Sequence, residues 1–150
     1  MQRNVVLGDL SNPIELQRLR DYLRDLYGYV SLKVTDGKVE TTDATVTTLL
    51  TLPLEDNKTV QIVADVVARR TGGSAGTAGD GASYRIIGTF TRVSAGNATL
   101  VGSLTADHTA ENQSGWDATL AVSGTDVLVR VTGAANNNIT WACTVTIQAI

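Results

Sequence analysis

The segment from Thr41 to Arg70 constrains the fold more than any other part of this sequence. It predicts two β-strands joined by a tight polar turn. Residues 46–54 are rich in Thr, Leu and Val, which suit a pleated, half-buried surface. Residues 55–58 supply the turn, because Asp and Asn side chains can hydrogen-bond their own backbone. The segment therefore predicts a β-hairpin.

The second strand of this segment alternates between apolar and polar side chains. One face carries only apolar residues, namely Val60, Ile62, Ala64, Val66 and Ala68. The opposite face is polar except at Val63 and Val67. We therefore expect something to cover that face in part, such as another subunit, and Val63 and Val67 are candidate interface residues.

Strand patterns continue from residue 29 to the end of the chain. Asp36-Gly37 indicates a further hairpin turn, and the glycine-rich residues 72–82 indicate a flexible tip that holds no single shape without neighbours. The later strands are expected at residues 83–93, 98–105, 116–122, 127–132 and 139–150. Short strands at this regular spacing predict a mainly β chain, a single antiparallel β-sandwich of jelly-roll-like type over residues 29–150.

Residues 1–28 differ from the rest and predict a short arm followed by an amphipathic α-helix. Asn12 can cap the helix, Pro13 suits its first position, and Gly28 can end it. A narrow apolar seam runs along it, formed by Leu16, Leu19, Leu23 and Leu26. So short a helix needs a surface to lie on. Its own domain, a symmetry mate and a larger partner all remain open, and we expect an attachment role.

Charge and hydropathy narrow the classes of partner. The net charge of −3 gives no reason to expect nucleic acid, which needs an excess of Lys and Arg. The sequence has neither the apolar run of a signal peptide nor the roughly 20 apolar residues of a membrane span. We therefore expect no membrane partner and synthesis in a cytoplasm.

The sequence contains no complete motif for catalysis, metal binding or phosphate binding. His108 is the single histidine, so it cannot complete a transition-metal set, and beside Asp107 it predicts a solvated pair before a polar turn. The spacing of Gly76 and Gly81 suits a phosphate-binding loop, but Ala82 stands where the lysine is needed. We expect no cofactor, no metal and no enzymatic activity.

Three further residues are expected to serve packing. Trp116 and Trp141 each belong to an alternating strand, where core or interface packing is the usual role. Cys143 is the single cysteine and is expected to be a small buried hydrophobe. The aspartates 36, 56, 80 and 126 are expected at turns, without a calcium-loop pattern.

Two stretches carry a resemblance to a known module. TTDATVTTLLTLPL is followed by VADVVARR and Tyr84, and Gly115-Trp116-Asp117 is followed by VLVRVTGAANNNITW. From Val39 to the end, the chain resembles a β-sandwich module found in tailed bacteriophages, both in head decoration proteins and in tail-fibre parts. The resemblance implies a virion structural role, and such sandwiches often form trimers.

From this resemblance we expect a capsid decoration or cement protein that binds the major capsid protein as a homotrimer. The main alternative is a tail-fibre or neck component. A carbohydrate-binding, receptor-binding module is a further alternative, although aromatic residues are few. In the first two cases the protein would be located in the virion.

Overall fold

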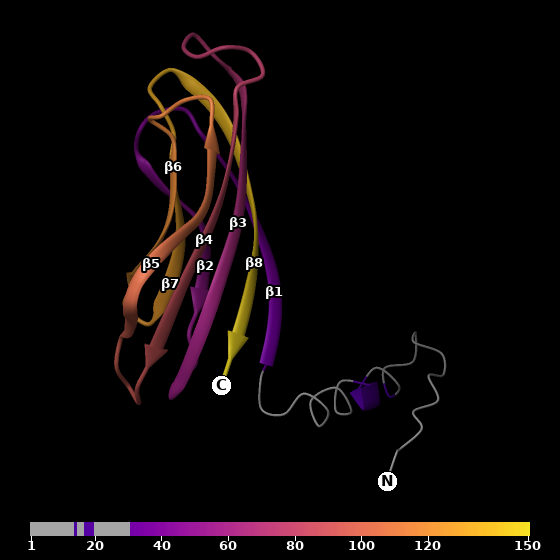
Figure 1. Cartoon of the computed structure of the whole chain (residues 1–150), viewed down its shortest axis with the longest axis vertical. Helices are drawn as coiled ribbons and strands as arrows, with labels where there is room; N and C mark the ends of the chain where they lie inside the picture. Colours follow the sequence, from indigo (N-terminus) through magenta and orange to yellow (C-terminus); the bar gives the residue numbers. More distant parts are fainter. Residues whose placement is uncertain (1–13, 15–16, 20–30) are drawn as a thin grey trace.

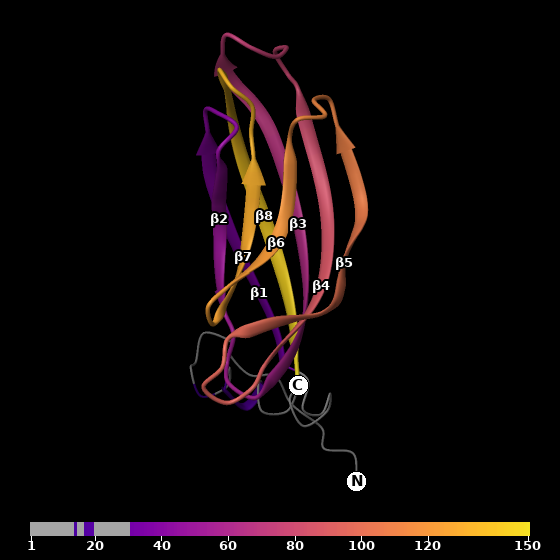
Figure 2. The ribbon, with the colours of Figure 1, turned by 90° about the vertical axis from the view of Figure 1, so that its left-hand side faces the viewer.

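The computed structural model describes residues 14, 17–19 and 31–150, and eight β-strands of this part form two antiparallel sheets packed face to face (Figures 1 and 2). The larger sheet has the order β1-β8-β3-β4-β5 and the smaller one β2-β7-β6. This architecture confirms the predicted β-sandwich. The strand bounds are β1 Ser31–Thr41, β2 Val46–Pro53, β3 Lys58–Gly73, β4 Gly81–Arg92, β5 Ala98–Glu111, β6 Asp117–Ser123, β7 Asp126–Thr132 and β8 Asn137–Ala149.

The core lies between the inner faces of the two sheets. In β3 the predicted apolar face is buried at every second residue from Val60 to Ala68, as the alternation requires. Trp141 of β8 lies at the centre, with its ring centroid 5.9 Å from that of Trp116 and 6.4 Å from that of Tyr84. Its indole Nε1 donates a hydrogen bond to Thr41 Oγ1 at 2.9 Å. Both tryptophans therefore have the predicted packing role.

The predicted hairpin between residues 46–54 and the following strand is wrong. β2 pairs with β7 in the smaller sheet, whereas β3 pairs with β4 and β8 in the larger one. The polar turn is real, but it carries the chain from one sheet to the other. Leu54 is buried within this crossing, where its N–H donates to the carbonyl of Thr125. Burial of this leucine between the sheets directs the crossing.

The predicted turn at Asp36-Gly37 is also wrong, because β1 continues through both residues while paired with β8. Gly37 is needed there for space. A Cβ at this position would lie 2.9 Å from the carbonyl oxygen of Leu49 and 3.2 Å from the Cβ of Leu50, both in β2. The glycine thus lets the edges of the two sheets approach, and close packing outweighs the local turn preference.

The connections gather at two ends of an elongated sandwich. At one end, the loop end, the β3–β4 loop projects beyond the sheets near the β7–β8 turn (Figure 1). At the other end, the base, lie the β2–β3 and β4–β5 turns and the C-terminal end of β8 (Figures 1 and 2). Strand pairing between Ser31 and Ala149 puts the start of β1 at the base as well.

The N-terminal helix is described only in part. Ile14 and Gln17–Leu19 are helical, in agreement with the prediction for these residues. Leu16, Leu23, Leu26 and the boundary between residues 28 and 29 lie outside the described residues. The division into an attachment segment and a β-domain therefore stays a prediction.

Candidate functional site

The loop end is held by a network of side-chain to backbone hydrogen bonds. Arg70 at the end of β3 donates from Nε to the carbonyl of Ala75 at 2.8 Å and from a terminal nitrogen to that of Gly73 at 2.6 Å. Asp80 accepts from the N–H of Thr77 and from the side chain of Gln113, both at 2.8 Å. The glycine-rich loop thus has the neighbours that its sequence needs to hold one shape.

Asn137, at the start of β8, lies beside Gly76 of the same loop. It is almost fully buried, and a Cβ on Gly76 would lie only 2.7 Å from its Nδ2. Gly76 has a φ of +72°, which favours glycine on its own account. Within the described part of the chain, Asn137 Oδ1 has no hydrogen-bond partner. The loop joins two antiparallel strands, which differs from the strand-to-helix geometry of a phosphate-binding loop.

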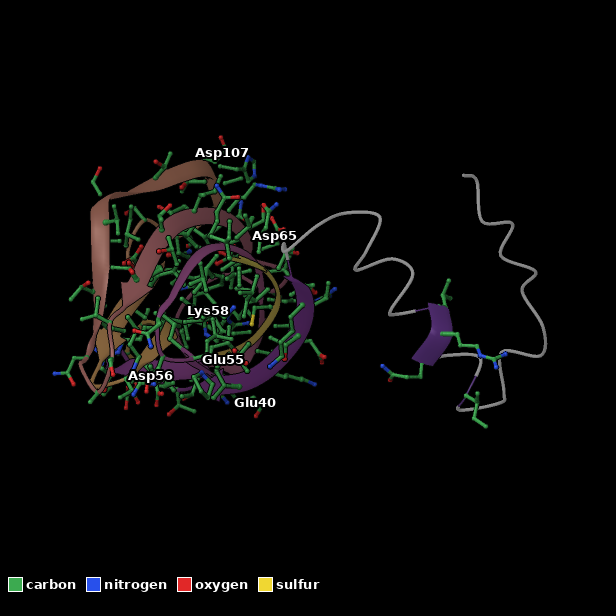
Figure 3. The ribbon with its side chains drawn as sticks, turned by 90° about the horizontal axis from the view of Figure 1, so that it is seen from below. Glu40, Glu55, Asp56, Lys58, Asp65 and Asp107 are labelled. Atoms are coloured by element: carbon green, nitrogen blue, oxygen red, sulfur yellow. The ribbon has the colours of Figure 1, made fainter. Side chains whose placement is uncertain are left out.

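His108 lies within β5 and not before a turn, because this strand continues to Glu111. Its Nε2 is 3.1 Å from Ser83 Oγ on the neighbouring strand β4. Asp107 is 3.7 Å from Arg85, which lies 3.3 Å from Asp65. Figure 3 shows Asp65 and Asp107 on the outer side of the larger sheet. These side chains are exposed, as predicted for a solvated pair, but each has a partner.

The Ser83–His108 contact has the distance of a nucleophile and its base, yet its surroundings suit a structural role. β4 forms strand pairs on both sides, so the backbone N–H groups around Ser83 are used in the sheet. An oxyanion hole needs free N–H groups aimed at the reacting atom. In residues 31–150 and the four described helical residues, no group of three His, Cys, Asp or Glu residues could hold a metal ion.

Tyr84 is a buried phenol whose polar end reaches a carboxylate. Its hydroxyl donates to Glu111 Oε2 at 2.7 Å. Burial raises the pKa of Tyr84 far above its usual value, and the hydrogen bond and negative charge of Glu111 add to this effect. Burial likewise raises the pKa of the Cys143 thiol. Cys143 is therefore the small buried residue that the sequence predicts.

The two interface candidates of β3 lie on the outer face of the larger sheet. Val63 is half-buried between Thr146 and Ile87, whereas Val67 is 56% exposed between Ala142 and Ser83. Leu19 is half-buried, and the other three leucines of the seam lie outside the described residues. Their role as interface residues stays a prediction.

Sequence reasoning missed the residues that share this outer face with Val63. Val34 of β1 and Val101 of β5 are 62% and 49% exposed, and Ile87 of β4 is half-buried. The apolar interruptions of otherwise polar strand faces are the signal that could have found them. Their alignment in one surface depends on the strand order, which no local pattern gives.

Among the described residues, no helix has both the length and the apolar character needed to span a membrane.

Comparison with known proteins gives a fold and no family. No protein-family model matches the chain, and no curated protein matches it. The tailspike protein of Acinetobacter baumannii phage AM24 is similar over 79% of this chain, with a TM-score of 0.50 and 9% sequence identity. The likeness is one of fold.

A second solved structure, the tailspike protein of Acinetobacter phage vB_ApiP_P1, matches 79% of this chain with a TM-score of 0.38 and 15% identity. This chain covers 26% of the AM24 protein and 22% of the second one. It therefore spans about a quarter of the length of the AM24 tailspike, the protein that it resembles in fold.

Proposed function

We propose that this chain is a structural β-sandwich module of a bacteriophage virion, of the kind found in tailspikes or tail fibres, and that it acts as a homotrimer. The observation that carries the proposal is the fold shared with part of the AM24 tailspike over 79% of this chain. The resemblance of its sequence to modules of phage virions supports it independently.

The fold similarity to part of a tailspike favours the tail-fibre alternative over the capsid cement role expected from the sequence. The cement role and its partner, the major capsid protein, rest on the sequence resemblance alone. The fold comparison supports a tail part. A sugar-stacking surface has less support, because every aromatic side chain of residues 31–150 is buried: Tyr84, Phe90, Trp116 and Trp141.

Immuno-electron microscopy tests the proposal directly. Antibodies against the recombinant chain are applied to purified virions of a phage whose genome encodes it. Label at the tail is the expected result. Label over the head would instead support the cement role, and particles without label would overturn a virion role altogether.

A mechanical role also implies no hydrolytic activity at Ser83 and His108. The wild-type chain and Ser83→Ala are compared with an activated ester such as p-nitrophenyl acetate. We expect both to hydrolyse it at the background rate. A rate that falls at least tenfold in Ser83→Ala would identify a working nucleophile and contradict the proposal.

A further inference from the structure

A surface without charged side chains crosses all five strands of the larger sheet on its outer face. Strand register aligns its residues in three successive rows in the half nearer the base. We call this surface the uncharged band. Its rows are Thr59, Thr91 and Thr99; then Gln148, Gln61, Thr89 and Val101; then Val34, Thr146, Val63, Ile87 and Thr105.

The two edges of the band carry aliphatic side chains where a monomer would be expected to carry charge. Val34 on edge strand β1 is 62% exposed, and Val101 on edge strand β5 is 49% exposed. Edge strands of soluble monomers commonly place Lys or other charged residues on such positions. Aliphatic residues at both edges, joined by Thr and Gln between them, are typical of a surface that another molecule covers.

The row that borders the band on the loop-end side is different. It carries Asp36, Asp65, Arg85 and His108, with Arg85 paired to both Asp65 and Asp107. The charges are thus confined beyond the band, and Arg85 neutralises part of them. Val67 lies beyond this charged row, separated from Val63 by Asp65. The band therefore includes only one of the two interface candidates.

We propose that the uncharged band is the surface through which copies of this chain contact one another. Thr hydroxyls and Gln amides both donate and accept hydrogen bonds, so the band of one copy can contact a different part of the band on a second copy, as a threefold contact requires, or the same part, as a twofold contact requires. A charged face would instead meet its own charge. Since the chain has a net charge of −3, a self-contact is favoured where the charges are absent.

The area of the band is of the right order for such a contact. Each side chain on a sheet face covers about 32 Å², from the strand spacing and the rise per residue. About a dozen side chains then give a flat area of about 400 Å², which protruding side chains enlarge. A stable interface buries about 800 Å² per partner. The band therefore supplies the central part of an interface that its rim completes.

Mass measurement of the full chain and two variants tests this inference. The band variant carries Val34→Lys and Val101→Lys, which places a like charge at each edge of the band. The control is Val46→Lys, because Val46 is 54% exposed but lies on the smaller sheet. Circular dichroism shows that each variant is folded, and light scattering at micromolar concentration gives its mass relative to the 15.8 kDa monomer.

We expect wild type and the control to form the same assembly, and the band variant to associate at least tenfold more weakly. A monomeric wild type, an unchanged mass of the folded band variant, or equal dissociation of the control would each overturn the inference. The inference deepens the proposed homotrimer. A dimer that the band variant dissociates would support the band and contradict the trimer, whereas virion labelling tests the phage role separately.

A thiol probe provides a second measurement. Cys143 is the one cysteine of the chain and is buried, so an introduced cysteine reports its own exposure. Val101→Cys should react with a thiol reagent at least tenfold more slowly in the assembly than after dilution to monomer. Val46→Cys should react equally in both. Equal protection of the two thiols would contradict a contact through the band.

Discussion

Arg70 and Arg92 stabilise the connections at the two ends of the sandwich by donating hydrogen bonds to backbone carbonyls. Arg70 bonds the loop end through Gly73 and Ala75. At the base, Arg92 donates to the carbonyls of Leu54 and Gly96 at 2.7 and 2.9 Å and forms an ion pair with Asp56 at 2.9 Å. Because these carbonyls belong to separate turns, Arg92 joins the β2–β3 connection to the β4–β5 connection.

Replacement of Arg92 by Gln should therefore lower the free energy of unfolding more than most surface substitutions do. Its side chain is only 18% exposed, and its loss leaves partly buried carbonyls without a donor. We expect the free energy of unfolding in urea to fall by about 2 kcal/mol. Arg85→Gln is the matched control, since Arg85 is 47% exposed in its ion pairs and should cost less than about 1 kcal/mol. Equal losses would contradict the bridging role.

Tyr84 predicts a dependence of stability on alkaline pH. Burial and Glu111 raise its pKa in the folded state, whereas the unfolded value is about 10. A group with a raised folded pKa stabilises the fold fully below its unfolded pKa and loses this contribution as the pH rises above it. Tyr84 should thus destabilise the fold above pH ~10, by up to about 1.4 kcal/mol per pH unit.

Tyr84→Phe isolates this contribution. At neutral pH the variant should be less stable by about 1 kcal/mol, because the hydrogen bond to Glu111 is lost. Between pH 9 and 11 the stability difference between wild type and variant should shrink, measured by urea unfolding at each pH. A difference that stays constant across this range would show that the phenol ionises normally in the folded protein.

Within single strands, the sequence predicts which side chains are buried better than it predicts which strands pair with one another. The alternation in β3 identified its buried residues from Val60 to Ala68. It could not reveal that β2 pairs with β7, because that pairing joins residues far apart in the sequence. At Asp36-Gly37 the local turn signal misled, since the glycine serves the approach of β1 to β2.

The β3–β4 loop gives a prediction at this scale. Gly76 and Gly79 both have positive φ, +72° and +94°, so alanine strains the backbone at either position. Only at Gly76 would the new Cβ meet Asn137, at 2.7 Å from Nδ2, while at Gly79 nothing lies within 4 Å. The two substitutions therefore separate backbone strain from packing against the β7–β8 turn.

We expect Gly79→Ala to cost about 1–2 kcal/mol of unfolding free energy, and Gly76→Ala about 1 kcal/mol more. Thermal and urea unfolding of both variants provide the measurement. If the two variants lost the same stability, the loop would not be anchored on Asn137 in solution.

At the scale of the molecule, the larger sheet leaves an outer face that ordinary strand patterning does not explain. The sequence indicated a covered face through Val63 and Val67, but not its extent. The uncharged band combines residues of β1, β3, β4, β5 and β8, which only the tertiary fold brings into register. Even so, it excludes Val67, because the charged row through Asp65 lies between. The extent of this surface depends on the strand order, which the local patterns of the sequence do not reveal.

The β-sandwich is expected to fold independently of residues 1–28. Every buried side chain of the described residues comes from Thr41 to Val145, and β1 to β8 close the hydrogen-bonded sheets among themselves. Deletion of residues 1–28 should therefore shift the Tm of the sandwich by less than about 4 °C, at equal protein concentration. Ile62→Ala in the full chain is the reference for the destabilisation that loss of a core side chain causes. Ile62 is fully buried, and its truncation should lower the free energy of unfolding by about 2–5 kcal/mol. The same deletion should abolish incorporation into virions if these residues attach the protein. A truncated chain as unstable as Ile62→Ala would instead make the N-terminal helix part of the core and remove its attachment role.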